Sequence, residues 1–437
     1  MIEIVSYPSE PQADKLRAIL GRRAGVPAEV EETVRDILRQ VREGGDRALA
    51  ELTRKIEKVE LEPEQFRVPV EILDAAAAAL DAELRVAIEA AVDNIRAFHE
   101  RQKTNSWFME DGDGVILGKK VIPIQRVGIC VPGGQAPLIS SLLMAAVPAQ
   151  VAGVEEICVV SPPKENGRPH PDIMGAARLL GLEEVYGIGG AQAVGAMAFG
   201  TESIDQVDKI VGPGSLYTVA AKQQVYGIVG IEMIPGPSEI VVLADAEADP
   251  RYIAADLLSQ AEHGTGFEAS VCITPSAELA QGVRQEVIRQ AEALPETAVV
   301  ETALRNFGAV VVVPDLETGV ELLNRMAPEH AELMVAEPWT WLEGIKNAGA
   351  VFMGPASTEP VGDYFAGTNH ILPTNGTARY ASSLGLGDFV KTTSIVAYSD
   401  RRLRRVGGQV ATLARAEGLE AHARAVEIRT GDDRRES

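Results

Sequence analysis

The stretch RVGICVPGG, residues 126–134, is a short apolar run that ends in a Pro-Gly-Gly turn. The helix-like stretch APLISSLLMAAVPAQVAG follows at residues 136–153, and EEICVVSPP at residues 155–163 is strand-like again. Short apolar runs that alternate with helix-length segments are typical of parallel strands joined by crossover helices. We therefore predict an α/β fold built on a parallel sheet.

The same alternation continues along the chain. EEVYGIGG (183–190) and VDKIVGPG (207–214) are strand-like, and the helix-like AQAVGAMAFG (191–200) separates them. A second series begins at EIVVLAD (239–245) and ends at GAVFMGP (349–355), so the chain holds two α/β blocks of similar size. Ligands of such sheets bind beyond the carboxyl ends of the strands. We expect the active site there, in a crevice between the blocks.

Helical segments flank the two blocks. PAEVEETVRDILRQVREGG (27–45) begins with a proline and ends in Gly-Gly, and residues 70–98 contain neither Pro nor Gly. The stretch 401–429 is helical and charged, and the tail TGDDRRES (430–437) is expected to fray. Because a terminal helix with few apolar residues rarely packs only on its own chain, we expect residues 401–429 to contact a partner subunit.

The composition is that of a soluble globular protein. The chain has 437 residues, of which 46% are hydrophobic and 24% charged, and no apolar run is long enough to cross a bilayer. MIEIVSYPSEPQ, the first twelve residues, lacks the basic start and apolar core of a secretory signal, so we expect a cytoplasmic protein. The net charge of −22 argues against a nucleic-acid-binding surface.

The three cysteines form neither a disulfide framework nor a thiolate zinc site, because they are far apart and no CxxC spacing occurs. We predict that Cys158 and Cys272 are buried as small hydrophobic residues. Cys130, which lies directly before a glycine-rich turn, is left open.

The six histidines fall into two groups. His99 and His170 lie in polar surroundings and are predicted to be at the surface. The other four stand beside functional-looking groups, in SQAEHG (His263), APEHAE (His330), VGDYFAGTNH (His370) and EGLEAH (His422).

Gln260 and His263 are three residues apart at the predicted end of a helix, so they share one helix face. Together with Asp363 and His422 they offer the nitrogen and oxygen donors that zinc accepts. One aspartate against a dication leaves a formal charge of about +1, which suits Lewis-acid work or substrate binding. The wide spacing leaves open a second interpretation, in which the four are unrelated polar residues.

Glu329 and His330 are neighbours in the tripeptide PEH. Near neutral pH a histidine can take a proton and a glutamate can activate water. Neighbours in a strand point to opposite faces, so the two can serve one site only from a turn. The alternative is a helix-end pair that faces solvent.

Three glycine-rich strand exits, VPGGQAP (131–137), GIGGAQ (187–192) and VGPGS (211–215), would let backbone amides approach a phosphate. The second exit resembles a dinucleotide fingerprint in which Gln192 replaces the third glycine. Simple tight turns explain the three exits equally well.

Taken together, these fragments resemble the histidinol dehydrogenase family from about residue 25 to residue 430. The resemblance rests on IGGAQAVGAMAFGTESI, VDKIVGPG, GPSE, DLLSQAEHG, PEH, GDYFAGTNHILPT, SSLGLGDF and EGLEAHARAVEIR. It implies two incomplete Rossmann-like domains with parallel sheets, a helical N-terminal region and a C-terminal helical arm. We expect a helical arm over 1–30, a first α/β domain over 31–126 and 238–380, a second over 127–237, and a dimerisation arm over 381–437.

The resemblance also implies an activity: oxidation of L-histidinol through L-histidinaldehyde to L-histidine, the last step of histidine biosynthesis. Members of the family use two NAD and one zinc ion per subunit, and they are homodimers. The implied zinc ligands are Gln260, His263, Asp363 and His422, and the implied proton-transfer residues are Glu329 and His330. Substrate contacts would come from Ser238, Gln260, His263, His330, Glu359, Asp363, His370, Glu417 and His422. In this family Glu417 and His422 would reach the site from the partner subunit.

Three positions depart from the family pattern. Cys130 stands where the family usually has Tyr, Ser215 where it usually has Asn, and Pro235 where it usually has Ala before GPSE. The first two belong, with Gln192, to the family's NAD contacts. We therefore expect NAD binding that is weaker or differently arranged.

Two other functions stay open. A paralogue could oxidise another alcohol such as a sulfonated propanediol, although Glu359 and Glu417 would repel a sulfonate. A non-catalytic zinc-binding relative would fit the changed NAD positions, although the chain keeps both Glu329 and His330.

Overall fold

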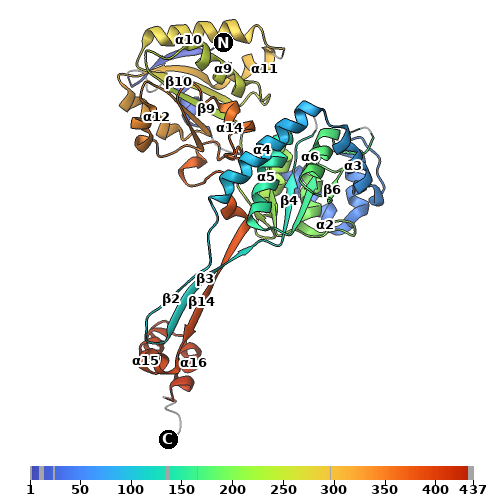
Figure 1. Cartoon of the computed structure of the whole chain (residues 1–437), viewed down its shortest axis with the longest axis vertical. Coiled ribbons are helices and arrows are strands. Elements are labelled where there is room, and N and C mark those ends of the chain that lie inside the picture. The colour runs from blue at the N-terminus through green and yellow to red at the C-terminus, as the bar shows by residue number, and fades with distance from the viewer. Residues whose placement is uncertain are drawn as a thin grey trace. The chain divides into compact units, whose positions relative to one another are not determined.

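Figure 1 shows the computed structural model of the chain. It describes residues 2–8, 14–22, 25–133, 137–164, 166–295 and 297–431. Contacts divide the chain into two compact units. The first comprises Met1–Gln102 and Ile124–Phe389, and the second comprises Lys103–Pro123 and Val390–Ser437.

The first unit contains a five-stranded parallel sheet in the order β6-β5-β4-β7-β8. Its strands are β4 (Arg126–Cys130), β5 (Glu156–Val160), β6 (Val185–Tyr186), β7 (Lys209–Val211) and β8 (Gly230–Ile231). The helices between them are α5 (Ile139–Ala152), α6 (Pro171–Leu179), α7 (Gly190–Phe199) and α8 (Leu216–Val225). The chain winds outward from β4 in both directions, so the predicted alternation of strands and helices is confirmed, with a topological switch point between β4 and β7.

A six-stranded parallel sheet completes the first unit, in the order β1-β11-β10-β9-β12-β13. Its strands are β1 (Glu3–Ser6), β9 (Glu239–Ala244), β10 (Ala269–Thr274), β11 (Gly308–Val312), β12 (His330–Met334) and β13 (Ala350–Met353). Its helices are α9 (Pro250–Ala261), α10 (Ala277–Ala291), α11 (Thr297–Phe307), α12 (Leu316–Met326), α13 (Pro338–Trp341) and α14 (Glu359–Tyr364). The two parallel sheets confirm the predicted α/β class.

The N-terminal segment differs from the helical arm predicted for residues 1–30. Residues 3–6 form the edge strand β1, which pairs in parallel with β11, and the helix α1 (Asp14–Leu20) follows. The strand forms because the buried Val5 and its neighbours gain pairing and apolar contacts from a distant part of the chain.

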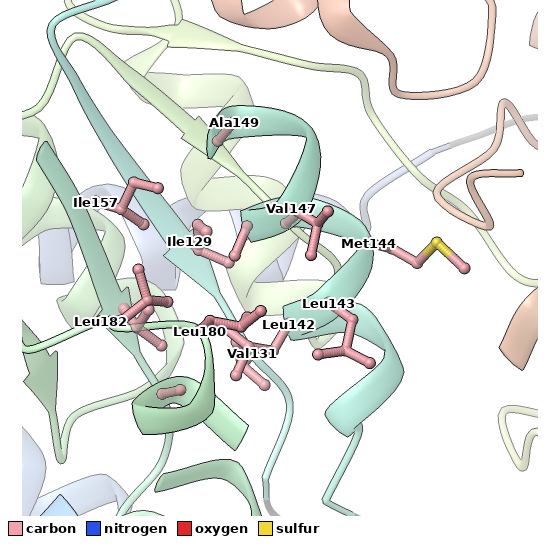
Figure 2. Close-up of a cluster of buried hydrophobic side chains, with 14 of the residues drawn as sticks. Ile129, Val131, Leu142, Leu143, Met144, Val147, Ala149, Ile157, Leu180 and Leu182 are labelled. Atoms are coloured by element: carbon pink, nitrogen blue, oxygen red, sulfur yellow. The ribbon is translucent and has the colours of Figure 1, made fainter. Parts of the chain in front are cut away.

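The next helices cover the five-stranded sheet. They are α2 (Ala28–Ile56), α3 (Val70–Ala79) and α4 (Ala82–Glu100). Val34 of α2 is buried in a cluster with Ile188, and Ile88 of α4 in a cluster with Val127. These helices therefore share a core with the sheet of residues 126–231. The sequence prediction instead assigns residues 31–126 to one domain with residues 238–380. Figure 2 shows part of this core, where Ile129 and Ile157 face apolar side chains such as Val147 and Leu182.

The second unit is a three-stranded antiparallel sheet followed by two helices. Its strands are β2 (Trp107–Glu110), β3 (Val115–Pro123) and β14 (Val390–Tyr398), and in the sheet β3 lies between the other two. Its helices are α15 (Asp400–Ala416) and α16 (Glu420–Thr430). Trp107, Phe108 and Val396 of the sheet and Leu413 and Ile428 of the helices are exposed. Of the tail predicted to fray (430–437), Thr430 is the last residue of α16 and Gly431 follows it, and residues 432–437 lie outside the described residues.

The structure also shows the burial of the cysteines and of two of the histidines. Cys158 and Cys272 are buried, as predicted, and Cys130 is buried too. His99 is not at the surface: it is buried, and its Nδ1 lies 2.8 Å from Ile95 O. The cause is its helix face, because His99 continues at helical spacing the buried stripe that ends at Ile95. His170 is half-buried at the start of α6.

No helix among the described residues is long and apolar enough to cross a membrane.

A buried ion pair stabilises the turn after β7. The side chains of Lys222 and Glu232 are 1% and 0% exposed, and Lys222 Nζ lies 2.5 Å from Glu232 Oε1. Lys222 also donates to Gly212 O at 3.0 Å, and Glu232 Oε1 accepts the Gly212 N–H at 2.8 Å. The pair therefore holds both backbone polar groups of Gly212.

We predict that Glu232→Gln lowers the free energy of unfolding by about 3 kcal/mol, because it leaves the Lys222 charge buried without a counter-charge. The urea midpoint of the circular dichroism signal measures the loss. Glu89→Gln, which breaks the exposed Arg85–Glu89 pair on α4, is the control and should leave the midpoint unchanged. Equal midpoints for both variants would contradict the prediction.

Candidate active site

Most of the predicted site residues of the first unit gather at the amino ends of β9 and β12. Ser238 lies directly before β9, and Glu329 and His330 lie at the start of β12. Gln260 is in the last turn of α9, which returns the chain to the amino end of β10. The prediction that the site lies at the carboxyl ends of the strands is therefore wrong for this sheet.

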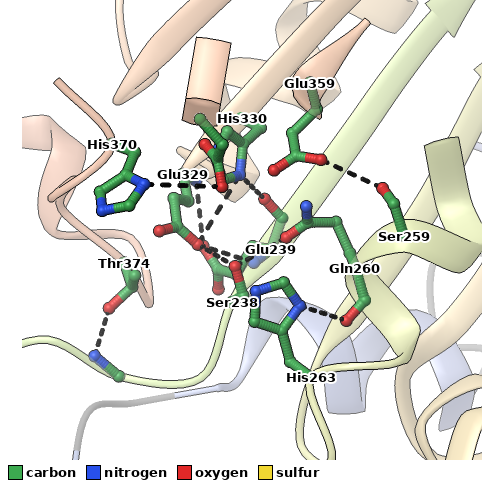
Figure 3. A network of polar contacts seen from close by, with 12 residues as sticks. Ser238, Glu239, Ser259, Gln260, His263, Glu329, His330, Glu359, His370 and Thr374 are labelled. Carbon is green, nitrogen blue, oxygen red and sulfur yellow. Dashed lines mark hydrogen bonds and ion pairs between the residues drawn. The ribbon is translucent and has the colours of Figure 1, made fainter. Parts of the chain in front are cut away.

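Ser238 links an amide to a carboxyl group (Figure 3). Its Oγ lies 2.6 Å from Gln260 Oε1 and 2.6 Å from Glu329 Oε2. One hydroxyl donates only one proton, so Ser238 can donate to Glu329 when the Gln260 amide presents its nitrogen to the Ser238 Oγ. Burial raises the pKa of Glu329, whereas the charge of His330 and the Ser238 hydroxyl oppose that rise. The loop ahead of Ser238 is held by Thr374, whose Oγ1 accepts the Gly236 N–H at 2.5 Å.

His330 is 2% exposed and has two different ring nitrogens. Nδ1 lies 3.0 Å from Glu239 O and donates to it, whereas Nε2 has no hydrogen-bond partner in the described parts of the chain. Nε2 lies 3.6 Å from Asp363 Oδ1. Burial would lower the pKa of His330, but the carboxylates of Glu329 and Asp363 outweigh it and raise the pKa to about 10. Nε2 is thus the nitrogen that can exchange a proton with a ligand.

Glu329 and His330 do face one site, since His330 Nδ1 lies 3.7 Å from Glu329 Oε2. Glu329 belongs to the turn before the strand, so the alternation of strand side chains does not separate the pair. Both are buried, which rules out the alternative of a pair that faces solvent.

The short helix α14 brings two carboxylates to the same place. Ligand-type atoms of His330, Glu359 and Asp363 all lie within 4.8 Å of one another, an arrangement that could hold a metal ion. Asp363 Oδ2 also lies 3.9 Å from Nδ1 of the half-buried His370. Burial opposes ionisation of Asp363, but the nearby His330 and His370 lower its pKa to about 2. Burial and the charge of Asp363 raise the pKa of Glu359 to about 8.

Gln260 and His263 differ in exposure. Gln260 is fully buried and its Nε2 has no hydrogen-bond partner among the described residues, whereas His263 is exposed just beyond the helix end. His263 Nδ1 lies 3.1 Å from Gln260 O, which leaves its Nε2 for a ligand (Figure 3). Glu417 and His422 lie in the second unit, at the end of α15 and in α16, and both are exposed.

The three predicted NAD contacts line a separate cavity of about 740 Å³. The cavity lies at the carboxyl ends of β4, β5 and β7, the edge at which a ligand of a Rossmann-like sheet is expected. Gln192 is fully buried in its wall, and neither amide atom has a hydrogen-bond partner in the described residues. Ser215 is exposed and caps α8, with its Oγ accepting the Thr218 N–H at 3.4 Å. Burial raises the pKa of the Cys130 thiol to about 12, so Cys130 offers the cavity a neutral thiol.

A glycine is required directly before Pro213, which lines this cavity. Gly212 has φ +103°, and a Cβ there would overlap Cys130 O. Residues Gly134, Gln135 and Ala136 of the predicted exit VPGGQAP lie outside the described residues.

Sequence reasoning missed three buried acidic residues beside the site: Glu239, Asp256 and Glu332. Glu332 had a signal, because it follows His330 by two positions in a strand and therefore lies on the same face. Asp256 and Glu239 stand in apolar stretches, where an acidic residue is unusual unless it is paired.

The sequence profile of the family described as Histidinol dehydrogenase matches residues 21–430 of this chain. Histidinol dehydrogenase of Halalkalibacterium halodurans is 50% identical over 404 residues, which cover 92% of this chain and 95% of that relative. Histidinol dehydrogenase of Geobacillus kaustophilus is 49% identical over 419 residues, which cover 95% of this chain and 98% of that relative.

A solved structure agrees with these relatives. The crystal structure of histidinol dehydrogenase from Elizabethkingia anophelis matches this chain with a TM-score of 0.91 and 36% identity, and the match covers 99% of each chain. The chain therefore belongs to the histidinol dehydrogenase family of oxidoreductase enzymes.

Proposed function

We propose that this protein oxidises L-histidinol through L-histidinaldehyde to L-histidine, with two NAD and one zinc ion per subunit. The observation that carries the proposal is the buried Glu329–His330 pair, placed beside Gln260 and Asp363 in a chain of this family. A proton-transfer pair of this kind is what alcohol oxidation followed by aldehyde hydration requires.

The donors of the first unit fit a zinc ion. Gln260 offers an amide oxygen, His263 an imidazole nitrogen and Asp363 a carboxylate oxygen, and zinc accepts nitrogen and oxygen donors of these kinds. We propose that the partner subunit's His422 is the fourth. A bound zinc ion would act as a Lewis acid that orients the substrate. With one carboxylate among its ligands, the site keeps a formal charge of about +1, which suits a neutral imidazole.

The chain's own residues then move the protons. The carboxylates of Glu329 and Asp363 hold a proton on His330, and a cation bound at Asp363 would weaken that hold. The neutral ring could then accept the hydroxyl proton at Nε2, because Nδ1 is engaged by Glu239 O. For the second oxidation, Glu329 and His330 take a proton from the water that adds to the aldehyde carbon. NAD supplies the hydride acceptor for each step. Keeping the aldehyde in place between the two oxidations prevents its loss to solvent.

We propose that NAD binds in the 740 Å³ cavity at the carboxyl ends of β4, β5 and β7. The unpartnered amide of the buried Gln192 and the amino ends of α7 and α8 support this assignment, because they offer donors to a dinucleotide. Cys130 has neither the aromatic face nor the phenol of the family's usual tyrosine, so we keep the expectation of weaker or differently arranged binding.

We propose a homodimer in the cytoplasm, in which the partner subunit's Glu417 and the partner subunit's His422 complete the active site. The exposed apolar side chains of the second unit support a protein partner there, among them Trp107, Phe108 and Leu413. The net charge of −22 supports the expectation that neither a nucleic acid nor a membrane is the partner.

The stoichiometry of the reaction separates the proposed function from its two rivals. With L-histidinol, zinc and excess NAD, we expect two NADH for each histidinol consumed, because both oxidations occur at one site. The count is made from NADH absorbance against histidinol and histidine by chromatography. One NADH per substrate, or turnover of a sulfonated propanediol without turnover of histidinol, would favour a paralogue. No turnover with zinc bound would favour a non-catalytic relative.

A charge substitution at Gln260 tests why an amide stands there. Gln260→Glu should keep zinc bound but raise the KM for histidinol about tenfold, a loss of about 1.4 kcal/mol, because it adds negative charge to the site. Zinc content and steady-state kinetics measure the two effects. Gln285→Glu, on the exposed face of α10, is the matched control and should change neither. Full activity of Gln260→Glu would refute the charge argument.

Restoring the family's tyrosine tests the cofactor cavity. Cys130→Tyr should lower the KM for NAD roughly fivefold, as expected for one aromatic contact worth about 1 kcal/mol. Cys130 lines the cavity, so the larger tyrosine ring has space that a closed core would not provide. Initial rates at varied NAD give the KM, and Cys272→Ser in the other sheet is the control. An unchanged or higher KM in folded Cys130→Tyr would contradict the prediction.

A further inference from the structure

Two buried carboxyl groups, on β12 and on α9, lie close to His330 and Glu359. Glu332 of β12 is 1% exposed and Asp256 of α9 is 6% exposed. Among the described residues, no ion pair to a cationic side chain is found for either group. Burial and the charge of Asp256 raise the pKa of Glu332 to about 9.

The pair also holds the beginning of α14. Glu332 Oε1 accepts the Glu359 N–H at 2.9 Å, and Asp256 Oδ1 accepts the Thr358 hydroxyl at 2.8 Å. Ser259, which follows in α9, donates to Glu359 Oε2 at 3.2 Å. Two successive residues at the start of α14 are thus fixed by β12 and α9.

Those three elements carry the proposed chemistry. β12 begins with His330, α9 ends near Gln260, and α14 bears Asp363 one turn after Glu359. Glu332 lies on the same strand face as His330, since the two are two positions apart. Asp363 therefore has its place relative to Gln260 and His330 set through the Asp256–Glu332 pair.

We infer that Glu332 and Asp256 are positioning residues, whose carboxyl oxygens hold the start of α14 so that Asp363 faces Gln260 and His330. The inference rests on the proposed function, because Asp363 matters here as a zinc ligand.

A purely structural role makes a different prediction. If the pair only filled the core, removing it would lower thermal stability, as any truncation of a buried side chain does. Its zinc affinity would then equal that of another variant with the same loss of stability. If the pair positions Asp363, zinc affinity falls in protein that is still folded, as is typical when the group supporting a metal ligand is lost.

The test compares three variants with the wild type. Glu332→Ala removes the contacts to Asp256 and Glu359, and zinc affinity, measured by competition with a chromophoric chelator, should fall roughly tenfold or more. Glu332→Gln is neutral, can donate to Asp256 and can accept the Glu359 N–H, so its zinc affinity should stay within about threefold of the wild type. Leu333→Ala truncates the neighbouring buried residue on the opposite face of β12, and it should lower the melting temperature without lowering zinc affinity.

Zinc affinity in Glu332→Ala equal to that in Leu333→Ala would overturn the positioning role. If Glu332→Ala does not fold, Asp256→Ala takes its place, since it removes the same pair from the helix side.

The outcomes also separate this inference from the proposed function. A wild-type protein that neither binds zinc nor forms NADH from histidinol would defeat the proposed function. A wild-type protein that does both, with folded Glu332→Ala and Asp256→Ala variants of unchanged zinc affinity, would defeat the inference alone.

Discussion

The chemistry of this protein depends on the burial of acidic groups at the amino edge of the six-stranded sheet. Glu239, Asp256, Glu329, Glu332 and Glu359 are all buried there. Ionised carboxylates so close together are costly unless each is neutralised, paired or hydrogen-bonded. The edge therefore favours cations, and a dication or an ammonium group that binds there gains from charges the fold has already buried.

The fold neutralises these groups in different ways. Glu239 is paired with Arg22, whose Nη1 lies 2.8 Å away, although burial still raises the pKa of Glu239 to about 7. Glu329 receives the Ser238 hydroxyl and the Glu239 N–H. Asp363 faces His330 and His370. The result is a graded set of acids within one site, and a proton-transfer site needs such a set because its groups must hold protons at different affinities.

The sequence was sufficient for those features that follow from local pattern. Short apolar runs between helix-length segments predicted both parallel sheets, because strands buried on both faces are apolar throughout. Strand β1 could not be predicted, since its stability comes from pairing with β11 far along the chain. His99 could have been predicted to be buried, because it continues an apolar helix stripe through Ile95.

The site was predicted unevenly for a related reason. Glu329, His330, Gln260 and Asp363 were found through motifs, and the structure brings them together. Their location at the amino edge was not foreseen, because the rule for parallel sheets concerns loops at the carboxyl ends. Here the last turn of α9 and the turn before β12 deliver the side chains instead. Glu332 and Asp256 were not predicted, because no motif marks a residue that acts only by positioning other residues.

Two pairs show how charge distinguishes the two halves of the first unit. Beside the 740 Å³ cavity, Glu232 is buried with a lysine, so the Gly212 turn is held by groups whose charges cancel. Near His330, Glu332 is buried with a second acid, Asp256, and their oxygens hold the start of α14. A lysine in place of Glu332 could not accept the Glu359 N–H, and its positive charge would oppose a cation next to Asp363. An acid pair accepts both the backbone and the hydroxyl proton and leaves the site attractive to cations, which explains why two acids stand there and a salt bridge stands beside the cavity.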